Sequence, residues 1–160
     1  ICEDLAAKMF LYVAKKLKKW GYLNYEVSNF AKPKFTCAHN FSYWRGDEYM
    51  GIGPSAASRI KIGQQWFEGK EDLIPQTNLI LKKLSAPNRL REIIMTGLRT
   101  NEGFNLSILY DFKTSINKAL DLEKITHLEQ LKMIKLTKKN LRILSSGRLF
   151  LNYIKSEIIL

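Results

Sequence analysis

The sequence predicts a mixed α/β fold in which residues 1–80 alternate between helix and strand and residues 81–160 form a mostly helical domain. Two observations lead to this expectation. In the first half, a long amphipathic stretch is followed at once by a β-type segment and a polar loop, a pattern typical of parallel strands linked by helices. In the second half, apolar residues recur mainly at helical spacing.

The composition is that of a globular protein with a basic surface. Of the 160 residues, 46% are hydrophobic and 26% are charged, and the formal net charge is +11. Residues 1–80 contain 11 basic and 8 acidic residues, whereas residues 81–160 contain 15 and 7. This excess favours an acidic ligand, nucleic acid or an anionic membrane surface as partner. Two cysteines cannot build a disulfide framework, so we expect a reducing, cytoplasmic compartment.

An amphipathic helix is predicted almost at the first residue, which is Ile1 rather than Met. We therefore expect the chain to be the later part of a longer protein. Glu3 and Asp4 lie in the first turn, lysines fill the last turn, and Gly21 follows. The lysines complement the helix dipole, although they could also contact phosphates. The apolar positions at helical spacing are Leu5, Met9, Phe10, Val13, Leu17 and Trp20.

Short strands and loops are expected to follow this helix. Loops after strands are where α/β folds place their chemistry. In order, we predict a strand at 22–28, a polar loop at 31–46, a strand at 49–52, a loop of small residues at 51–58, a strand at 59–62 and a turn or hairpin over 63–69 anchored by Trp66 and Phe67.

The second half predicts helices around one hairpin, an order that suggests a winged-helix-like domain. Ser85 followed by Pro87 indicates a helix start, and this helix is expected to end near Arg99. We then predict, in order, a short helix at 106–112, one or two helices across 116–133 with Leu120, Leu128 and Leu131 inward, a basic hairpin of 134–136 and 141–144, and a closing helix capped by Ser145 or Ser146.

The loop at 31–46 contains the side chains best suited to chemistry. His39 could hold haem iron or a metal, because imidazole is a common ligand for both, or it could satisfy loop backbone. Asn40 could orient a ligand or cap the loop, and Tyr43 and Trp44 could stack on a flat ring or plug the loop onto the core. Cys37 lies close to His39, but the spacing is not that of a zinc site.

Three further residues could contribute to a binding pocket. Gly51 and Gly53 would let backbone amides approach a phosphate, carboxylate or nucleoside, although a tight strand exit explains them as well. Glu26 could bind a hydroxyl or an amine, or it could be an exposed carboxylate at the sheet edge. His127 lies in a helical stretch and is expected to face solvent.

Three ordered motifs resemble the radical S-adenosylmethionine proteins related to oxygen-independent coproporphyrinogen III oxidase, and within them the HemW-type haem chaperones. The motifs are YEVSNFAKP at 25–33, CAHNFSYWRG at 37–46 and YMGIGP at 49–54. The similarity continues in MTGLRTNEG at 95–103 and in LSSGRLFLN at 144–152, so that it covers nearly the whole chain.

This resemblance implies a fold and a function. The first half would be the last strands and helix of an incomplete radical-SAM (β/α) barrel, and the second half its helical C-terminal domain. His39 would ligate haem iron, with Asn40, Tyr43 and Trp44 around it, and Gly51 and Gly53 would help to form the S-adenosylmethionine or substrate pocket. We add Glu26 to this pocket from its position in the preceding strand. As our own inference, Arg45, Arg59 and Lys61 would bind the propionates of the tetrapyrrole.

The chain also departs from the family pattern. The family holds a [4Fe-4S] cluster on three closely spaced cysteines, whereas Cys2 and Cys37 are the cysteines of this sequence. S-adenosylmethionine and the cluster are therefore expected only in full-length family members, and this chain is not expected to catalyse radical chemistry alone. Many members have glycine where Lys34 stands and Gly-Ala-His where this chain has Ser-Ala-Ala at 55–57.

The resemblance implies haem binding and delivery to membrane-associated respiratory haem proteins. From the residues themselves we also expect the basic face to contact the inner membrane surface, and an exposed sheet edge to lead to aggregation or a dimer. Oxidation of coproporphyrinogen III by the parent protein is the alternative within the family. A basic module that binds nucleic acid is the alternative from another class, based on Lys135, Lys138, Lys139, Arg142 and Arg148. Acidic Glu123 and Glu129 beside that hairpin argue against specific nucleic-acid binding.

Overall fold

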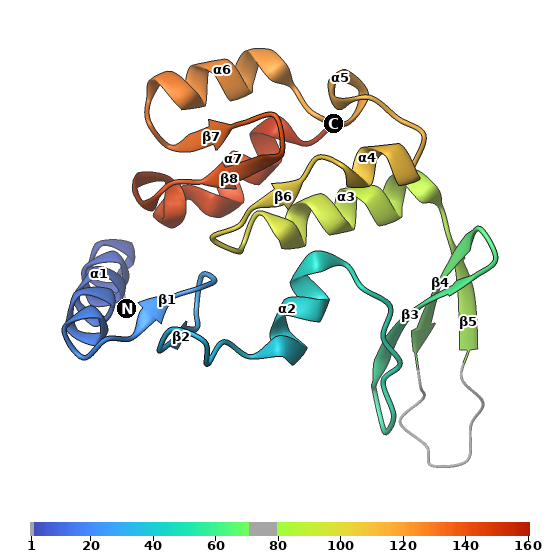
Figure 1. Ribbon diagram of the computed structural model, residues 1–160, viewed down its shortest axis with the longest axis horizontal. Coiled ribbons are helices and arrows are strands. Elements are labelled where there is room, and N and C mark those ends of the chain that lie inside the picture. Colours follow the sequence, from blue (N-terminus) through green and yellow to red (C-terminus); the bar gives the residue numbers. More distant parts are fainter. Residues whose placement is uncertain (1, 71–79) are drawn as a thin grey trace.

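The computed structural model describes residues 2–70 and 80–160, which form a mixed α/β structure (Figure 1). No closed barrel is seen among these residues, and every strand pair in them is antiparallel. The first elements in the chain are α1 (Glu3–Lys19), β1 (Leu23–Asn24), β2 (Phe30–Ala31), α2 (Ala38–Arg45), β3 (Ala57–Ile62), β4 (Gln65–Lys70) and β5 (Ile80–Leu84). The remaining elements are α3 (Ala86–Gly97), β6 (Phe104–Asn105), α4 (Ile108–Asp111), α5 (Ile116–Ala119), α6 (Leu122–Gln130), β7 (Ile134–Leu136), β8 (Asn140–Ile143), the 3₁₀ helix η1 (Ser145–Phe150) and α7 (Leu151–Ile158).

Helix α1 confirms the prediction from periodicity and end charges. Glu3 and Asp4 lie in its first turn and lysines in its last, and Gly21 beyond it has a φ of 79°, the left-handed conformation that ends many helices. None of its residues is buried. In Figure 1 this helix stands at the edge of the molecule, beside β1.

The strand predicted at 22–28 was wrong in extent and in pairing. Only Leu23–Asn24 is strand, and it pairs antiparallel with Phe30–Ala31. The chain reverses in between because the Glu26 carboxylate turns inward and accepts hydrogen bonds from the Ser28 N–H at 2.6 Å and from Asn29 Nδ2 at 2.8 Å. A parallel layer of linked strands is therefore not seen among the described residues.

The polar loop predicted at 31–46 contains a helix, α2, so this expectation was also wrong. The strand predicted at 49–52 is reduced to one bridge between Tyr49 and Arg59. The hairpin that follows is confirmed: β3 pairs with β4 from Ala57↔Lys70 to Ile62↔Gln65, and β5, which was not predicted, adds a third strand.

Helix α3 packs against elements from both halves of the chain. It begins as predicted, with Ser85 Oγ accepting the Asn88 N–H at 3.3 Å and Pro87 in the first turn. One face buries Leu90, Ile93 and Ile94. Figure 1 shows α2 and the β3–β5 sheet on one side of α3 and the elements from β6 to α7 on the other.

The main hydrophobic core lies between α3 and the C-terminus. The hairpin predicted there is confirmed and belongs to a three-stranded antiparallel sheet of order β6-β8-β7. Two details were wrong: Leu131 is 50% exposed, and residues 145–150 form η1 with no serine cap before α7. The buried core residues are Leu90, Ile93, Ile94, Leu98, Phe104, Leu109, Ala119, Leu120, Ile125, Leu128, Ile134, Leu141, Ile143, Leu151, Ile154 and Ile158.

Candidate functional site

Helix α2 carries the motif that the sequence singled out, and it is anchored at its C-terminal end. Gly46 ends the helix with a φ of 76°. Its carbonyl oxygen accepts a hydrogen bond of 2.6 Å from Arg89 Nη2 of α3. A Cβ atom at Gly46 would lie 2.6 Å from Ile93 Cγ1, so glycine is required both for the backbone conformation and for the close approach to α3.

His39 is exposed near the start of α2, and its ring is held by aromatic neighbours. The His39 and Tyr43 ring centroids are 4.8 Å apart with the planes at 86°, and the Tyr43 and Tyr49 centroids are 4.5 Å apart at 71°. Within residues 2–70 and 80–160, no hydrogen bond is made by the His39 imidazole, so its nitrogens are available to a ligand.

Asn40 and Trp44 lie on the same helix but contact other partners. Asn40 Nδ2 donates to the Tyr25 hydroxyl at 3.3 Å, and the Tyr25 ring lies 5.4 Å from that of Phe41. The Trp44 ring lies under the Arg99 guanidinium at 4.6 Å, and its buried Nε1 has no hydrogen-bond partner in the described part of the chain. The four predicted haem residues thus share one helix, with His39 and Tyr43 in one cluster and Trp44 in another.

Glu26 is completely buried, which excludes the exposed sheet-edge alternative. Its Oε2 accepts a hydrogen bond from Arg99 Nη2 at 3.2 Å, while its Oε1 is engaged by Ser28 and Asn29. Burial of a carboxylate is costly unless it is paired and hydrogen-bonded, and here both conditions hold. Glu26 therefore fastens the segment after β1 to the end of α3.

Gly51 and Gly53 form a tight entry into β3. A Cβ atom at Gly51 would lie 2.5 Å from the Ala57 carbonyl oxygen, and the Gly51 N–H donates to the buried Ser58 hydroxyl at 3.0 Å. Gly53 has a φ of 106°, and its carbonyl accepts the Ala56 N–H at 2.9 Å. Lys34 and Ser55 are non-glycine residues that also have left-handed backbone, with φ values of 72° and 64°.

The three basic residues predicted to bind propionates have different surroundings. Arg59 is engaged by Glu92, with nitrogen–oxygen distances of 2.6 and 3.0 Å, and this hydrogen bond raises the pKa of Arg59. Arg45 forms an exposed pair with Glu102 at 3.1 Å. Lys61 is exposed, with its Nζ 6.0 Å from the Trp66 ring centroid.

Glu92 lies between two arginines from different elements. Burial alone would raise the pKa of this carboxyl group, but hydrogen bonds and charges from Arg59 and Arg89 outweigh it and hold the pKa below its ordinary value. Arg89 Nη1 donates to Glu92 at 2.7 Å, and its guanidinium stacks on the Trp66 ring at 4.4 Å. This cluster joins β3 and β4 to α3.

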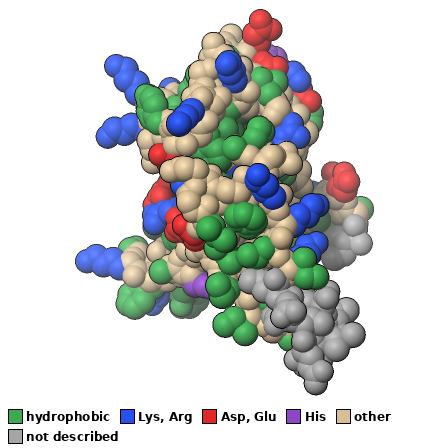
Figure 2. All heavy atoms as spheres, turned by 90° about the vertical axis from the view of Figure 1, so that its right-hand side faces the viewer, with side chains coloured by type: hydrophobic (Ala, Val, Ile, Leu, Met, Phe, Trp, Pro, Cys, Tyr) green, Lys and Arg blue, Asp and Glu red, His purple; other side chains and the backbone are tan. Residues whose placement is uncertain are grey.

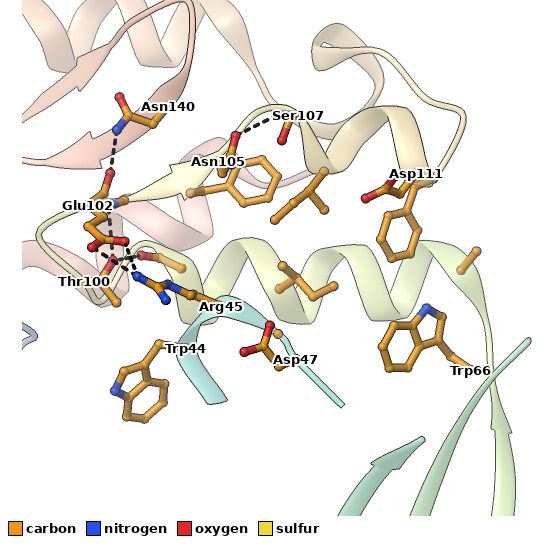
Figure 3. A pocket seen from close by; sticks show the side chains of 18 of the residues that line it. Trp44, Arg45, Asp47, Trp66, Thr100, Glu102, Asn105, Ser107, Asp111 and Asn140 are labelled. Carbon is orange, nitrogen blue, oxygen red and sulfur yellow. Dashed lines mark hydrogen bonds and ion pairs between the residues drawn. The ribbon is translucent and has the colours of Figure 1, made fainter. Parts of the chain in front are cut away.

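A cleft of about 1060 Å³ runs along α3 and includes part of the predicted site. Trp44 and Arg45 of α2 line it on one side and Trp66 at another end, as Figure 3 shows. On the facing wall Glu102 bonds both Arg45 and Asn140. His39 is not among its lining residues. Several residues of the sequence motif at 95–103 line this cleft. The motif matched the family pattern, but nothing in its local sequence indicated a cleft.

The remaining sequence expectations concern metals, membranes and exposed surfaces. In the part of the chain that the structure describes, no three His, Cys, Asp or Glu side chains gather as metal ligands, and both cysteines are exposed and free. None of the described helices is long and apolar enough to span a bilayer. His127 is exposed, as predicted. On the face shown in Figure 2, hydrophobic side chains gather over the lower half, at the height of α2 and the β3–β4 hairpin.

Comparisons with known proteins find HemN- and HemW-type relatives that match nearly the whole chain. Residues 84–150 match the family model of the HemN C-terminal domain. The chain is 30% identical to a haem chaperone HemW of Lactococcus lactis over 91% of its own length, and 28% identical to the mitochondrial radical S-adenosyl methionine domain-containing protein 1 of Danio rerio over 99%. It spans 40% of the length of each of these relatives.

One solved structure extends this likeness to the fold. The coproporphyrinogen III oxidase HemN of Escherichia coli, described as a radical SAM enzyme, superimposes with a TM-score of 0.60 at 17% identity. The match covers 91% of this chain and 39% of that one. The fold of most of this chain is therefore shared with a protein of known structure.

Proposed function

The chain is a HemN/HemW-like member of the radical SAM family, and from this premise we propose that it is the haem-binding portion of a haem chaperone, with His39 as the iron ligand. The relatives that suggest this role include haem chaperones HemW and a HemW-like protein of Buchnera aphidicola that is 30% identical over 87% of the chain.

The observation that carries the proposal is the state of the His39 side chain. Its imidazole is exposed, stands on a helix that Gly46 and Arg89 anchor, and lies edge-on against Tyr43 at 4.8 Å. A histidine nitrogen is among the commonest axial ligands of haem iron, and the neutral ring binds metal through a free nitrogen. An imidazole with these properties is available for ligation without any rearrangement of the chain.

The neighbouring residues supply orientation and charge in this proposal. Tyr43 fixes the plane of the imidazole, and Asn40 keeps the helix against Tyr25. Trp44 packs under Arg99 and holds the opposite side of α2. Arg45 and Lys61 are exposed and can reach acidic propionates, whereas Arg59 is already paired with Glu92.

Other components belong to the proposal at the level of the full-length family. S-adenosylmethionine and a [4Fe-4S] cluster would be bound with residues outside this sequence, because Cys2 and Cys37 are its two cysteines. Glu26, Gly51 and Gly53 would contribute to the base of that pocket by shaping the chain around it. Membrane-associated haem proteins would receive the haem, and a dimer would form through the sheet edges of the first half.

A haem titration followed by absorbance tests the proposal. We expect a saturable Soret shift for the chain that is lost in His39→Ala and retained in Cys37→Ala. His127→Ala is the matched control, because it removes an exposed imidazole from α6, outside the motif. A spectrum that never shifts, or that shifts equally for His39→Ala, would overturn the assignment of His39 as the iron ligand.

A further inference from the structure

Three basic side chains near the C-terminal end of α3 have fewer acidic partners than their positive charges require. Arg99, at the end of α3, and Arg148, in η1, line one small cavity together with Thr100 and Asn101. Lys155 of α7 stands close enough to Arg99 that the charge of Arg99 acts on it. We call Arg99, Arg148 and Lys155 the basic notch.

Glu26 is the one carboxylate that acts on the basic notch among the described residues. It pairs with Arg99 at 3.2 Å and attracts Arg148 at longer range. Arg148 Nη2 instead donates to the neutral side-chain oxygen of Asn101. Three positive groups therefore share one negative group, which leaves an excess of two positive charges in a partly buried place.

This excess is costly, because burial disfavours an unpaired charge. The pKa values of Arg148 and Lys155 reflect this cost. Burial lowers the pKa of Arg148, and burial together with repulsion from Arg99 lowers the pKa of Lys155. Arg99 Nε is also buried and has no acceptor in the described part of the chain.

We propose that the basic notch binds a carboxylate group, which completes the charge pairing of Arg99 and Arg148. Planar guanidinium groups match carboxylates through paired hydrogen bonds. The cavity between them measures about 10 Å³, the space of about one water molecule, so a single carboxylate oxygen could enter it while the rest of the ligand stays outside. Arg99 also stacks on Trp44, so a carboxylate bound here would touch the network that holds α2.

Two sources can supply this chemistry: a free small carboxylate, or the propionate arm of a tetrapyrrole held on the chain. The second source rests on the proposed function, whereas the site itself does not. The two are separated by using sodium propionate in one titration, and haem or haem dimethyl ester, whose carboxylates are blocked, in another.

The first experiment is a nuclear magnetic resonance titration of the isotope-labelled chain with sodium propionate at constant ionic strength. We expect the amide resonances of Thr100 and Asn101 to shift saturably, and Arg148→Gln to weaken this binding at least tenfold. Arg142→Gln is the matched control, because it removes the same charge from an exposed position on the adjacent strand β8. If Arg148→Gln does not give a folded chain, Lys155→Gln provides the same comparison.

Each outcome decides the proposal. No saturable shift with propionate, or equal weakening by Arg142→Gln and Arg148→Gln, overturns the carboxylate site whatever happens with haem. Saturable binding that is lost in Arg148→Gln supports it. Tighter binding of haem than of its dimethyl ester, with the difference abolished by Arg148→Gln, then identifies the propionate arm as the source. Equal binding of the two identifies a free carboxylate.

Discussion

The Arg99 guanidinium lies 4.6 Å over the Trp44 ring while its Nη2 donates to the completely buried carboxylate of Glu26 at 3.2 Å. The contact combines a cation–π interaction with a charge-assisted hydrogen bond. Glu26, Trp44 and Arg99 each belong to a different motif of the sequence. One arginine therefore links the segment after β1, the helix of the candidate haem site and the end of α3.

Glu26→Gln is expected to lower the free energy of unfolding by about 2–3 kcal/mol. The substitution leaves Arg99 without its charged acceptor, and the estimate is reduced from that for a fully buried pair because Arg99 is 27% exposed. Urea unfolding followed by circular dichroism measures the change. Glu102→Gln is the control, since its pair with Arg45 is exposed and should contribute less than about 1 kcal/mol. Equal effects of the two substitutions would contradict this account.

The Glu92 cluster should make the stability depend on pH in the acid range. The pKa of Glu92 is lower in the folded chain than its ordinary value of 4.5, so the unfolded state binds protons first as the pH falls. The stabilisation is complete above about pH 4.5 and is lost as the pH falls through the folded-state pKa. The stabilities of the wild type and Glu92→Gln should therefore converge as the pH falls below about 4.5. A constant difference across that range would show that the carboxylate charge is not involved.

Gly46→Ala should destabilise the chain by about 2–3 kcal/mol and weaken the anchoring of α2. The alanine would have to keep a positive φ, and its Cβ would lie 2.6 Å from Ile93 Cγ1. Gly63→Ala is a matched comparison, because Gly63 has a φ of 60° and no atom within 4 Å of the added Cβ. Its cost should be the backbone part alone, about 1 kcal/mol. If thermal unfolding gives the same decrease in Tm for both variants, the close contact with α3 does not contribute to the cost of Gly46→Ala.

Introducing glycine at two of the left-handed positions, Lys34 and Ser55, should stabilise the chain. Lys34 and Ser55 have φ values of 72° and 64°, which cost an L-residue more than they cost glycine. We expect Lys34→Gly and Ser55→Gly to raise the free energy of unfolding by about 0.5 kcal/mol each. Thr36→Gly, in the same segment but without a positive φ, should lower it slightly through unfolded-chain entropy. Destabilisation by all three glycine substitutions would contradict the strain argument.

The candidate site was partly visible in the sequence. The resemblance identified His39, Asn40, Tyr43 and Trp44, and the position of Glu26 in a predicted strand made it a candidate. Neither could indicate that Glu26 is buried against an arginine 73 residues away. Nor could either indicate that Arg59 is occupied by Glu92 of α3, 33 residues further along. These pairings depend on how distant segments meet, and no local pattern encodes them.

The sequence by itself determined the elements whose stability is local. Helix α1, the start of α3 at Ser85 and the β3–β4 hairpin follow from end charges, a cap and a turn that lie within a few residues of each other. Tertiary structure alone decided that the motif at 38–45 is a helix, because no side chain caps its start and no residue in it is buried. Its support comes from Tyr25, Arg89 and Arg99, which reach it from other parts of the chain. A short helix is marginal without such contacts, so the placement of His39 could only follow from the folded chain.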